Sequence, residues 1–276
     1  KEKLEHAISS ILFALSKKKG IIKMKKIYTP LITAPLTVGF GGSVGLLGPA
    51  VASGSAISSN LGQLLHINTK TRNLLIACAS AGAISSIFNF SLADNFEIKD
   101  TLFYVILGVG TAIASVYFTK MYFGILKLFE PLKSPKYRLL VGGIAIGIML
   151  YFIPPLYGEG FGFINNLLKG DHITALGSNP FDAYMDNIWV VIALLFGLTI
   201  FKAVAMTTTF AAGGAGGIFI PTMVMGSALG NVVAKVINNL GLGFAVSESN
   251  FTLIGMAGLI AGVLHAPLTA IFLIAE

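Results

Sequence analysis

Two uncharged stretches of this chain are too long for one membrane-spanning helix, and both are interrupted near the middle by glycines and proline. Residues 27–65 contain three prolines among many glycines, and residues 203–234 contain a Gly-rich segment that ends at Pro221. About 20 apolar residues span a bilayer, so we predict two helices joined by a Gly-rich hinge in each stretch. Non-helical backbone at membrane depth persists only where protein buries it or where it lines a watery cavity. Two such hinges therefore point to a site.

The composition places the whole chain in a membrane. Hydrophobic residues make up 55% of the 276 positions and charged residues only 11%, whereas a soluble domain usually carries about 25% charged residues. Mean hydropathy is +0.82. Strand-like alternation of polar and apolar residues is weak throughout, which disfavours a β-barrel. We expect an all-α polytopic protein of the cell membrane, and the other uncharged runs that could span it are residues 73–93, 101–119, 139–158, 187–201 and 249–275.

The positive charge of the chain does not indicate a nucleic-acid partner. The net charge is +7, and six lysines lie within residues 17–26. A lysine cluster between apolar segments is typical of a cytoplasmic loop under the positive-inside rule. The expected surroundings are therefore the lipid bilayer, and we expect no nucleic acid, no metal and no cofactor.

The sequence also repeats itself. Residues 45–57 and 217–229 share the pattern G-x-x-x-P-x-x-x-x-G-S-A-(I/L), and residues 81–88 resemble residues 257–264. The two matches lie at similar offsets of 172 and 176 residues. Paired repeats with Gly/Pro-interrupted segments at corresponding places are a sequence indication of a transporter or channel site.

The repeat predicts a discontinuity in the chain. In the second copy an apolar helix follows the matched segment, but no such helix follows Asn89 in the first copy. We expect residues to be missing between Asn89 and Phe90, and the chain to be incomplete at both ends. On this interpretation residues 1–276 form one transmembrane anion-conduction domain, with repeat cores at 28–89 and 188–276.

The chemistry available at each hinge is that of a helix N-terminus. The first turn of a helix carries unbonded N–H groups and about half a positive charge, and proline suits that turn. Such an end binds anions without a formal positive charge. If both helix starts meet, about four to six N–H groups could replace part of an anion's hydration shell. The alternative is that the glycines only allow close helix packing.

The hinge residues resemble a known family. Residues 42–49 (Gly-Ser-Val-Gly-Leu-Leu-Gly-Pro) look like the GSxGxEGP segment of the CLC chloride channels and chloride/proton exchangers, and residues 216–221 (Gly-Gly-Ile-Phe-Ile-Pro) are similar to their GxFxP segment. Residues 255–269 look like the family's late helical pair. The resemblance implies an inverted repeat whose broken helices meet at an anion site, and a homodimer with one pore for chloride or similar small anions in each subunit.

The resemblance also assigns site residues. It places anion coordination on the backbone N–H groups of Leu47, Gly48, Ile218, Phe219 and Ile220, with Gly45, Gly216 and Gly217 as hinge glycines. The family's GSGIP segment falls on residues 5–9, which makes His6 and Ser9 possible anion contacts. It places the family's coordinating tyrosine beyond Glu276 and the exchangers' inner proton-transfer glutamate in the helix expected after Asn89.

The main departure from the family is Leu47, which stands where the family usually has a gating glutamate. Leucine cannot ionise, so we predict passive, proton-independent anion conduction. The alternatives are a chloride/proton antiporter that uses another acidic residue and a non-conducting relative in which Leu47 closes the pore by dewetting. Residues 41–45 also match the G-x-S-x-G pattern of a hydrolase nucleophile, but no strand pattern precedes them as that motif requires. We expect no enzymatic activity.

Overall fold

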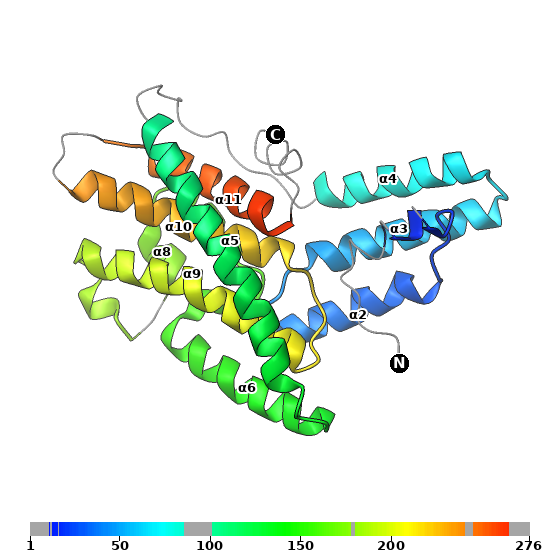
Figure 1. Cartoon of the computed structure of the whole chain (residues 1–276), viewed down its shortest axis with the longest axis horizontal. Coiled ribbons are helices and arrows are strands. Elements are labelled where there is room, and N and C mark those ends of the chain that lie inside the picture. The colour runs from blue at the N-terminus through cyan, green and yellow to red at the C-terminus, as the bar shows by residue number, and fades with distance from the viewer. Residues whose placement is uncertain are drawn as a thin grey trace.

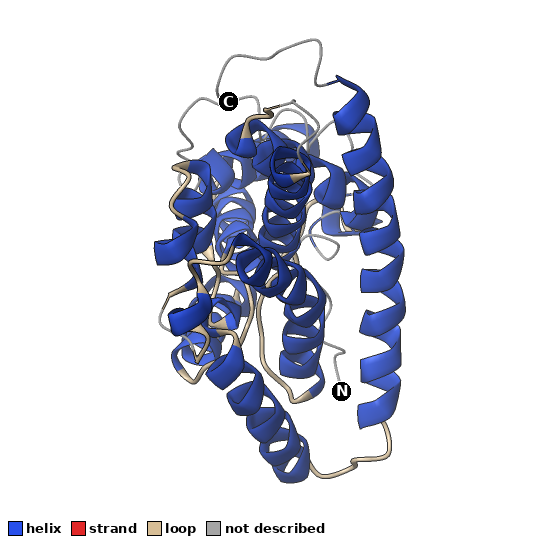
Figure 2. Cartoon of the chain, turned by 90° about the vertical axis from the view of Figure 1, so that its left-hand side faces the viewer, coloured by secondary structure: helices blue, strands red, loops and turns tan. Residues whose placement is uncertain are grey.

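The structure is a computed structural model that describes residues 11, 13–15, 17–85, 101–177, 180–240 and 245–264. Every element in these ranges is a helix (Figure 2), and the β pairing within them is a single isolated bridge. The all-α prediction is therefore confirmed. The elements are α2 (Lys25–Gly39), α3 (Leu47–Leu64), α4 (Thr69–Ser85), α5 (Thr101–Phe129), α6 (Pro135–Phe152), η2 (Pro154–Leu156), α7 (Phe161–Leu168), α8 (His172–Leu176), η3 (Asp182–Tyr184), α9 (Ile188–Ala211), α10 (Phe219–Asn239) and α11 (Glu248–Leu264).

Both long apolar stretches are broken as predicted. The first is divided into α2 and α3 by residues 40–46, and the second into α9 and α10 by residues 212–218. In Figure 1, α3 and α10 begin near the centre of the molecule and run outward in opposite directions. The two hinges therefore lie in the middle of the fold, with α4 packed against α3 and α11 packed against α10.

One boundary predicted from charge is wrong. Residues 187–201 and 203–234 are separate uncharged runs because Lys202 divides them, yet α9 continues through Lys202 without a break. The Lys202 side chain is completely buried, and its ammonium group donates hydrogen bonds to backbone carbonyls rather than reaching water. Because the charge is solvated by protein, it does not end the helix.

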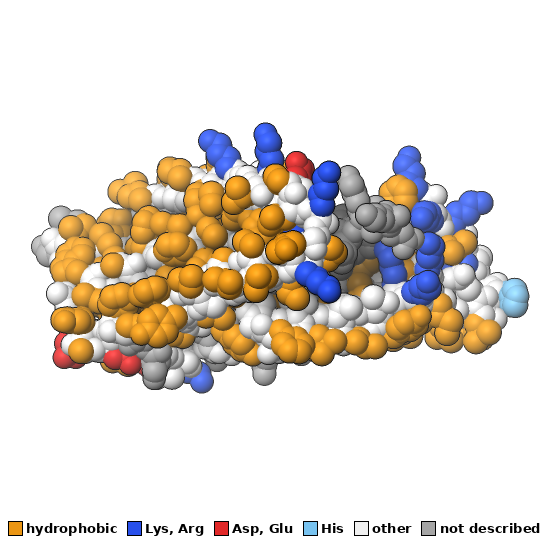
Figure 3. All heavy atoms as spheres, turned by 90° about the horizontal axis from the view of Figure 1, so that it is seen from below, with side chains coloured by type: hydrophobic (Ala, Val, Ile, Leu, Met, Phe, Trp, Pro, Cys, Tyr) orange, Lys and Arg blue, Asp and Glu red, His pale blue; other side chains and the backbone are white. Residues whose placement is uncertain are grey.

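The described part contains four helices that are long and apolar enough to cross a membrane, by length and composition. They are Leu102–Phe129, Pro135–Phe152, Ile188–Ala211 and Phe219–Asn239. Figure 3 shows one face of the molecule covered largely by hydrophobic side chains, with Lys and Arg side chains concentrated along one edge. Large apolar side chains on the outward faces of α5 and α6, such as Ile113 and Leu139, are more than half exposed. A lipid environment would cover this surface, and we describe the protein as a multi-pass membrane protein.

Close backbone contact joins α10 to α11. A Cβ atom added at Gly226 would meet the carbonyl of Gly255, and one added at Gly230 would meet the carbonyl of Phe251. Small residues that let two helix backbones touch are the usual means of helix association in membranes. These glycines are therefore packing residues, and they hold α10 firmly where its N-terminus reaches the hinge.

We predict that Gly230→Ala lowers the thermal stability of the purified protein in detergent, because α11 must move away to admit the new methyl group. Overpacking of this kind costs roughly 1–3 kcal/mol. The matched control is Gly143→Ala in α6, where a Cβ meets nothing within 4 Å. Since alanine is the better helix former, the control should be at least as stable as the parent. Equal melting temperatures for the two variants would contradict the packing assignment.

Candidate anion site

A single antiparallel backbone bridge joins the two hinges. The Gly45 N–H donates to the Gly217 carbonyl at 3.1 Å, and the Gly217 N–H donates to the Gly45 carbonyl at 2.8 Å. A Cβ at Gly45 would lie 3.0 Å from the Ile220 Cβ, and one at Gly217 would lie 3.2 Å from the Gly48 nitrogen. Each hinge glycine thus packs against the first turn of the opposite broken helix, and a side chain at either position would push the two helix starts apart.

Two threonines strengthen this junction reciprocally. The Ser43 N–H donates to the Thr209 hydroxyl oxygen at 3.2 Å, and the Ala215 N–H donates to the Thr37 hydroxyl oxygen at 3.1 Å. The two threonines are 172 residues apart, as are the two hinge residues that they accept from. A reciprocal pair of bonds is what a two-fold relation produces. The repeat in the sequence therefore corresponds to a local two-fold arrangement of the two hinges in space.

The helices that lead into the hinges end in the same way. Gly41 after α2 has φ +88°, and Gly213 after α9 has φ +103°. In each case the following residue donates its N–H to the carbonyl five residues earlier, at 2.8 Å. A glycine in the left-handed region with such a bond is the usual C-terminal cap of a helix. Both chain reversals therefore depend on a glycine at this position.

The starts of α3 and α10 have the chemistry of an anion site. Leu46 and Ile218 are their N-cap residues, and neither residue has a side chain that caps its own helix. Pro49 and Pro221, at the third helical position of each, have no N–H to offer. The first-turn N–H groups of a helix do not bond within the helix. The groups concerned are those of Leu46, Leu47 and Gly48 in α3 and of Ile218, Phe219 and Ile220 in α10.

The structure brings together most of the residues singled out from the sequence. Leu47 and Phe219 are the first residues of α3 and α10, and Gly48 and Ile220 are buried in the same two first turns. Gly216 is packed tightly, since a Cβ there would meet the Val44 side chain. The predicted contacts His6 and Ser9 lie outside the described residues. That the clustered N–H groups bind an anion stays a prediction.

A carboxylate that the sequence reasoning missed lies at the start of α3. Glu159 is in the turn before α7, between Gly158 and Gly160, which have φ of +59° and +91°. The backbone N–H of Leu46 faces the Glu159 carboxylate. Partial burial raises the pKa of Glu159 above its ordinary value, while the Leu46 N–H and the charge of Lys202 act in the opposite direction.

Lys202 is the second functional candidate that the sequence reasoning missed, and it bonds to the backbone that leads into the Glu159 turn. Its Nζ donates to the Leu156 and Gly158 carbonyls, both at 3.0 Å. The signal was present in the sequence, because an isolated ionisable residue in an apolar run is a functional hypothesis by default. For Glu159 the signal was a lone acidic residue in a Gly-Glu-Gly turn. Neither sequence pattern predicts where Lys202 or Glu159 lies relative to the two hinges.

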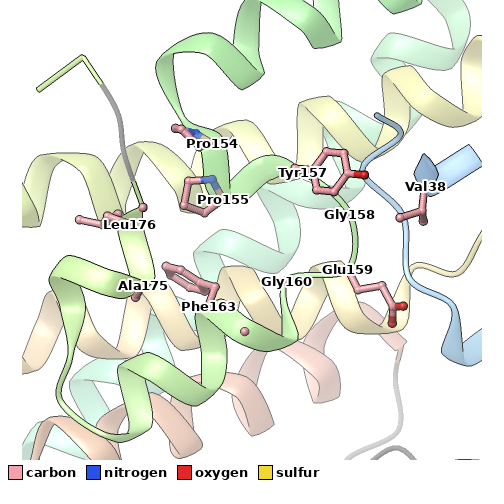
Figure 4. A pocket seen from close by; sticks show the side chains of 12 residues that line it. Val38, Pro154, Pro155, Tyr157, Gly158, Glu159, Gly160, Phe163, Ala175 and Leu176 are labelled. Carbon is pink, nitrogen blue, oxygen red and sulfur yellow. The ribbon is translucent and has the colours of Figure 1, made fainter. Parts of the chain in front are cut away.

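A pocket of about 430 Å³ lies beside Glu159. Its lining is almost wholly uncharged and includes Val38 from α2, Tyr157, Phe163 from α7 and Leu176 from α8. In Figure 4 the Glu159 side chain extends toward the segment that carries Val38 and away from the prolines of η2. Space of this kind has room for water or a small anion beside the Glu159 turn.

The residues of the G-x-S-x-G pattern occupy the hinge rather than a strand-to-helix turn. The Ser43 hydroxyl oxygen is buried and has no hydrogen-bond partner among the described residues. A hydrolase would also need a histidine to activate the serine, and His172 in α8 lies 3.4 Å from the Lys235 ammonium group. Within the described ranges, no group of three or more His, Cys, Asp or Glu side chains is placed to hold a metal.

Known proteins resemble this chain along nearly all of its length. The sequence model of the family described as "Voltage gated chloride channel" matches residues 2–94 and 90–276. A putative chloride channel protein, ClcB-like, of Ralstonia nicotianae is 23% identical over 309 residues, covering 93% of this chain and 68% of the relative. Chloride channel protein CLC-f of Arabidopsis thaliana is 24% identical over 327 residues, covering 95% of this chain and 40% of the relative. The voltage-gated ClC-type chloride channel ClcB of Escherichia coli is 23% identical over 194 residues, or 69% of this chain and 41% of the relative.

Two solved structures share the fold. The crystal structure of a CLC-type fluoride/proton antiporter matches 98% of this chain and 74% of its own, with a TM-score of 0.69 and 17% identity. The crystal structure of a slow cyanobacterial chloride/proton antiporter matches 97% of this chain and 75% of its own, with a TM-score of 0.69 and 18% identity. At these identities the likeness shows the architecture alone.

We predict that Thr209→Val destabilises the protein more than Thr207→Val. Both side chains are buried, but the Thr207 hydroxyl bonds only to its own helix, at the Ala203 carbonyl, whereas Thr209 also accepts from the hinge. Valine at 209 leaves the buried Ser43 N–H without an acceptor, which costs about 1–3 kcal/mol. Thermal unfolding in detergent measures the difference, and a Thr207 variant that is equally or less stable would refute the hinge role of Thr209.

Proposed function

This chain belongs to the voltage-gated chloride channel family, whose members are transporters and channels, and we propose that it conducts chloride or a similar small anion passively across the membrane. The observation that carries the proposal is the Gly45–Gly217 bridge. It holds the uncapped N-termini of α3 and α10 against each other at the centre of the fold. Such helix ends are anion sites.

Partial charges suit throughput better than full charges. A lysine or arginine at the site would bind an anion strongly and slow its release, whereas conduction needs binding that is weak enough for the ion to leave. Here the donors are the backbone N–H groups of Leu47, Gly48, Ile218, Phe219 and Ile220, backed by the two helix dipoles. On this proposal the anion lies between the two first turns.

The identity of residue 47 is the reason for proposing passive conduction. Leu47 is the first residue of α3, so a carboxylate there would stand at the positive end of the helix. Leucine carries no proton and competes for no N–H group. Coupled chloride/proton exchange is the second candidate, because Glu159 supplies a carboxylate to the same helix start, and because the two matched solved structures are named as antiporters.

The proposal extends to the assembly and the chain. We expect a homodimer in the cell membrane with one pore per subunit, and no cofactor. Residues 1–276 are assigned to one transmembrane domain with a discontinuity after Asn89. The two stretches matched by the family model overlap at residues 90–94, beside that position.

We predict that liposomes containing the protein and a chloride gradient lose chloride when valinomycin and potassium clamp the voltage, and that no proton movement accompanies the loss. A chloride electrode measures the anion and a trapped pH dye measures protons. Protein-free liposomes are the control. Uphill proton movement driven by the chloride gradient would reject passive conduction in favour of exchange.

Leu47 itself can be tested with a matched pair of variants. We predict that Leu47→Glu conducts less than Leu47→Gln at neutral pH, because an ionised carboxylate at the α3 N-terminus competes with the anion for N–H groups. The side chains are of similar size, so the pair isolates charge. The difference should shrink as the pH falls and the glutamate is protonated. Equal flux from both variants at every pH would show that residue 47 does not face the anion path.

A further inference from the structure

The net positive charge of the chain is concentrated in its first third. Residues 1–93 contain ten Lys and Arg and two Glu, a net charge of +8, whereas residues 94–276 contain nine Lys and Arg and ten Asp and Glu. Between His6 and Ala93 the sequence contains no acidic residue. The described basic residues of this part form a group that we call the basic end: Lys17, Lys18, Lys19, Lys23, Lys25, Lys26, Lys70 and Arg72.

The fold gathers the basic end in one place. The outer ends of α2, α3 and α4 lie together at the right of Figure 1. The Arg72 guanidinium group donates from Nε and Nη2 to the Lys19 carbonyl, at 3.2 and 2.6 Å. The Ser59 hydroxyl of α3 donates to the Gly20 carbonyl at 2.6 Å and accepts the Ile22 N–H at 3.0 Å. The backbone that carries the lysines before α2 is therefore fixed to both α3 and α4.

The basic end borders a surface that faces lipid. Two residues after Lys26, α2 begins to expose large apolar side chains, and those of Tyr28, Leu31 and Ile32 are each more than half exposed. An apolar surface of this kind marks a membrane contact. In Figure 3 the Lys and Arg side chains lie along one edge of the apolar face. The basic end therefore lies where the hydrocarbon of a bilayer gives way to lipid headgroups.

Three lysines of the basic end stand at the unfavourable ends of their helices. Lys25 and Lys26 are the first two residues of α2, and Lys70 is the second residue of α4. A helix N-terminus carries a partial positive charge, so a cation there lowers the stability of the helix. Neither helix has an acidic residue in its first turn. These lysines therefore weaken the protein by itself, and an anion bound to them would remove that cost.

We propose that the basic end binds the phosphate headgroups of anionic phospholipids, and that this binding stabilises the packing of α2, α3 and α4. Clusters of about four to eight Lys and Arg beside a membrane-spanning segment attract anionic lipids. The exposed side of α2 favours a lipid over a soluble anion, because acyl chains of the same molecule can cover Tyr28, Leu31 and Ile32. The basic end lies at the opposite end of α3 from the Gly45–Gly217 bridge.

The test measures thermal unfolding of the purified protein in a neutral detergent, with added phosphatidylglycerol or with phosphatidylcholine of the same acyl chains. Because a ligand that binds the native state stabilises it, phosphatidylglycerol should raise the melting temperature of the parent by at least about 2 °C. Phosphatidylcholine should not. Sodium gluconate at about 1 M, where the Debye length is only about 3 Å, should remove most of the difference. Equal shifts with both lipids would overturn the proposal.

Two matched double variants locate the effect. Lys25→Gln with Lys70→Gln removes two charges from the basic end, and Lys127→Gln with Lys133→Gln removes two exposed lysines near the turn after α5. In detergent alone the first variant should melt at or above the temperature of the parent, because it relieves two helix N-termini. It should gain less than half of the parent's shift with phosphatidylglycerol, whereas the second variant should keep that shift. If both variants keep the shift, or both lose it equally, the basic end is not the binding site.

A further measurement distinguishes a lipid from a soluble anion. Millimolar inorganic phosphate, added in place of phosphatidylglycerol at matched ionic strength, should leave the melting temperature of the parent unchanged. A shift with inorganic phosphate as large as that with phosphatidylglycerol would show that the basic end binds a soluble anion, and the lipid proposal would be wrong. Since these measurements involve no anion flux, their outcome is independent of whether the protein conducts chloride.

Discussion

The pairing of Gly45 with Gly217 is the contact on which the rest of the structure depends. Two backbone hydrogen bonds join hinges that are 172 residues apart, and each glycine packs against the first turn of the opposite helix. Because no side chain separates the two segments, the uncapped starts of α3 and α10 come together. Without this approach, the N–H and C=O groups of Gly45 and Gly217 would lack partners at membrane depth, where an unsatisfied polar group is costly.

The junction is stabilised by polar bonds that serve both halves at once. Thr37 and Thr209 each donate to a carbonyl in their own helix and accept an N–H from the opposite hinge. Irregular backbone inside a membrane protein must find its hydrogen-bond partners within the protein. The two-fold arrangement meets this requirement with the same threonine contact in each half.

Two charged residues near the junction, Lys202 and Glu159, partly offset each other's charge. Lys202 is buried in the middle of α9, where an unpaired ammonium group would be strongly unfavourable, and two carbonyls and the charge of Glu159 compensate for its burial. Lys202 and Glu159 therefore lie near each other beside the start of α3.

The sequence by itself determined the membrane class, the all-helical architecture, the two hinges and the correspondence between them, because apolar run length, glycine and proline act locally and leave a readable pattern. It also pointed to the first turns that begin at Leu47 and Phe219. Only the tertiary structure decided that Lys202 lies inside a continuous helix, that Thr37 and Thr209 bond across the hinges, and that Glu159 reaches Leu46. These contacts join segments that are remote in the chain, and which residues meet depends on how whole helices pack against each other. Hydropathy marks Lys202 as a break, because it cannot show that carbonyls far away in the sequence solvate the charge.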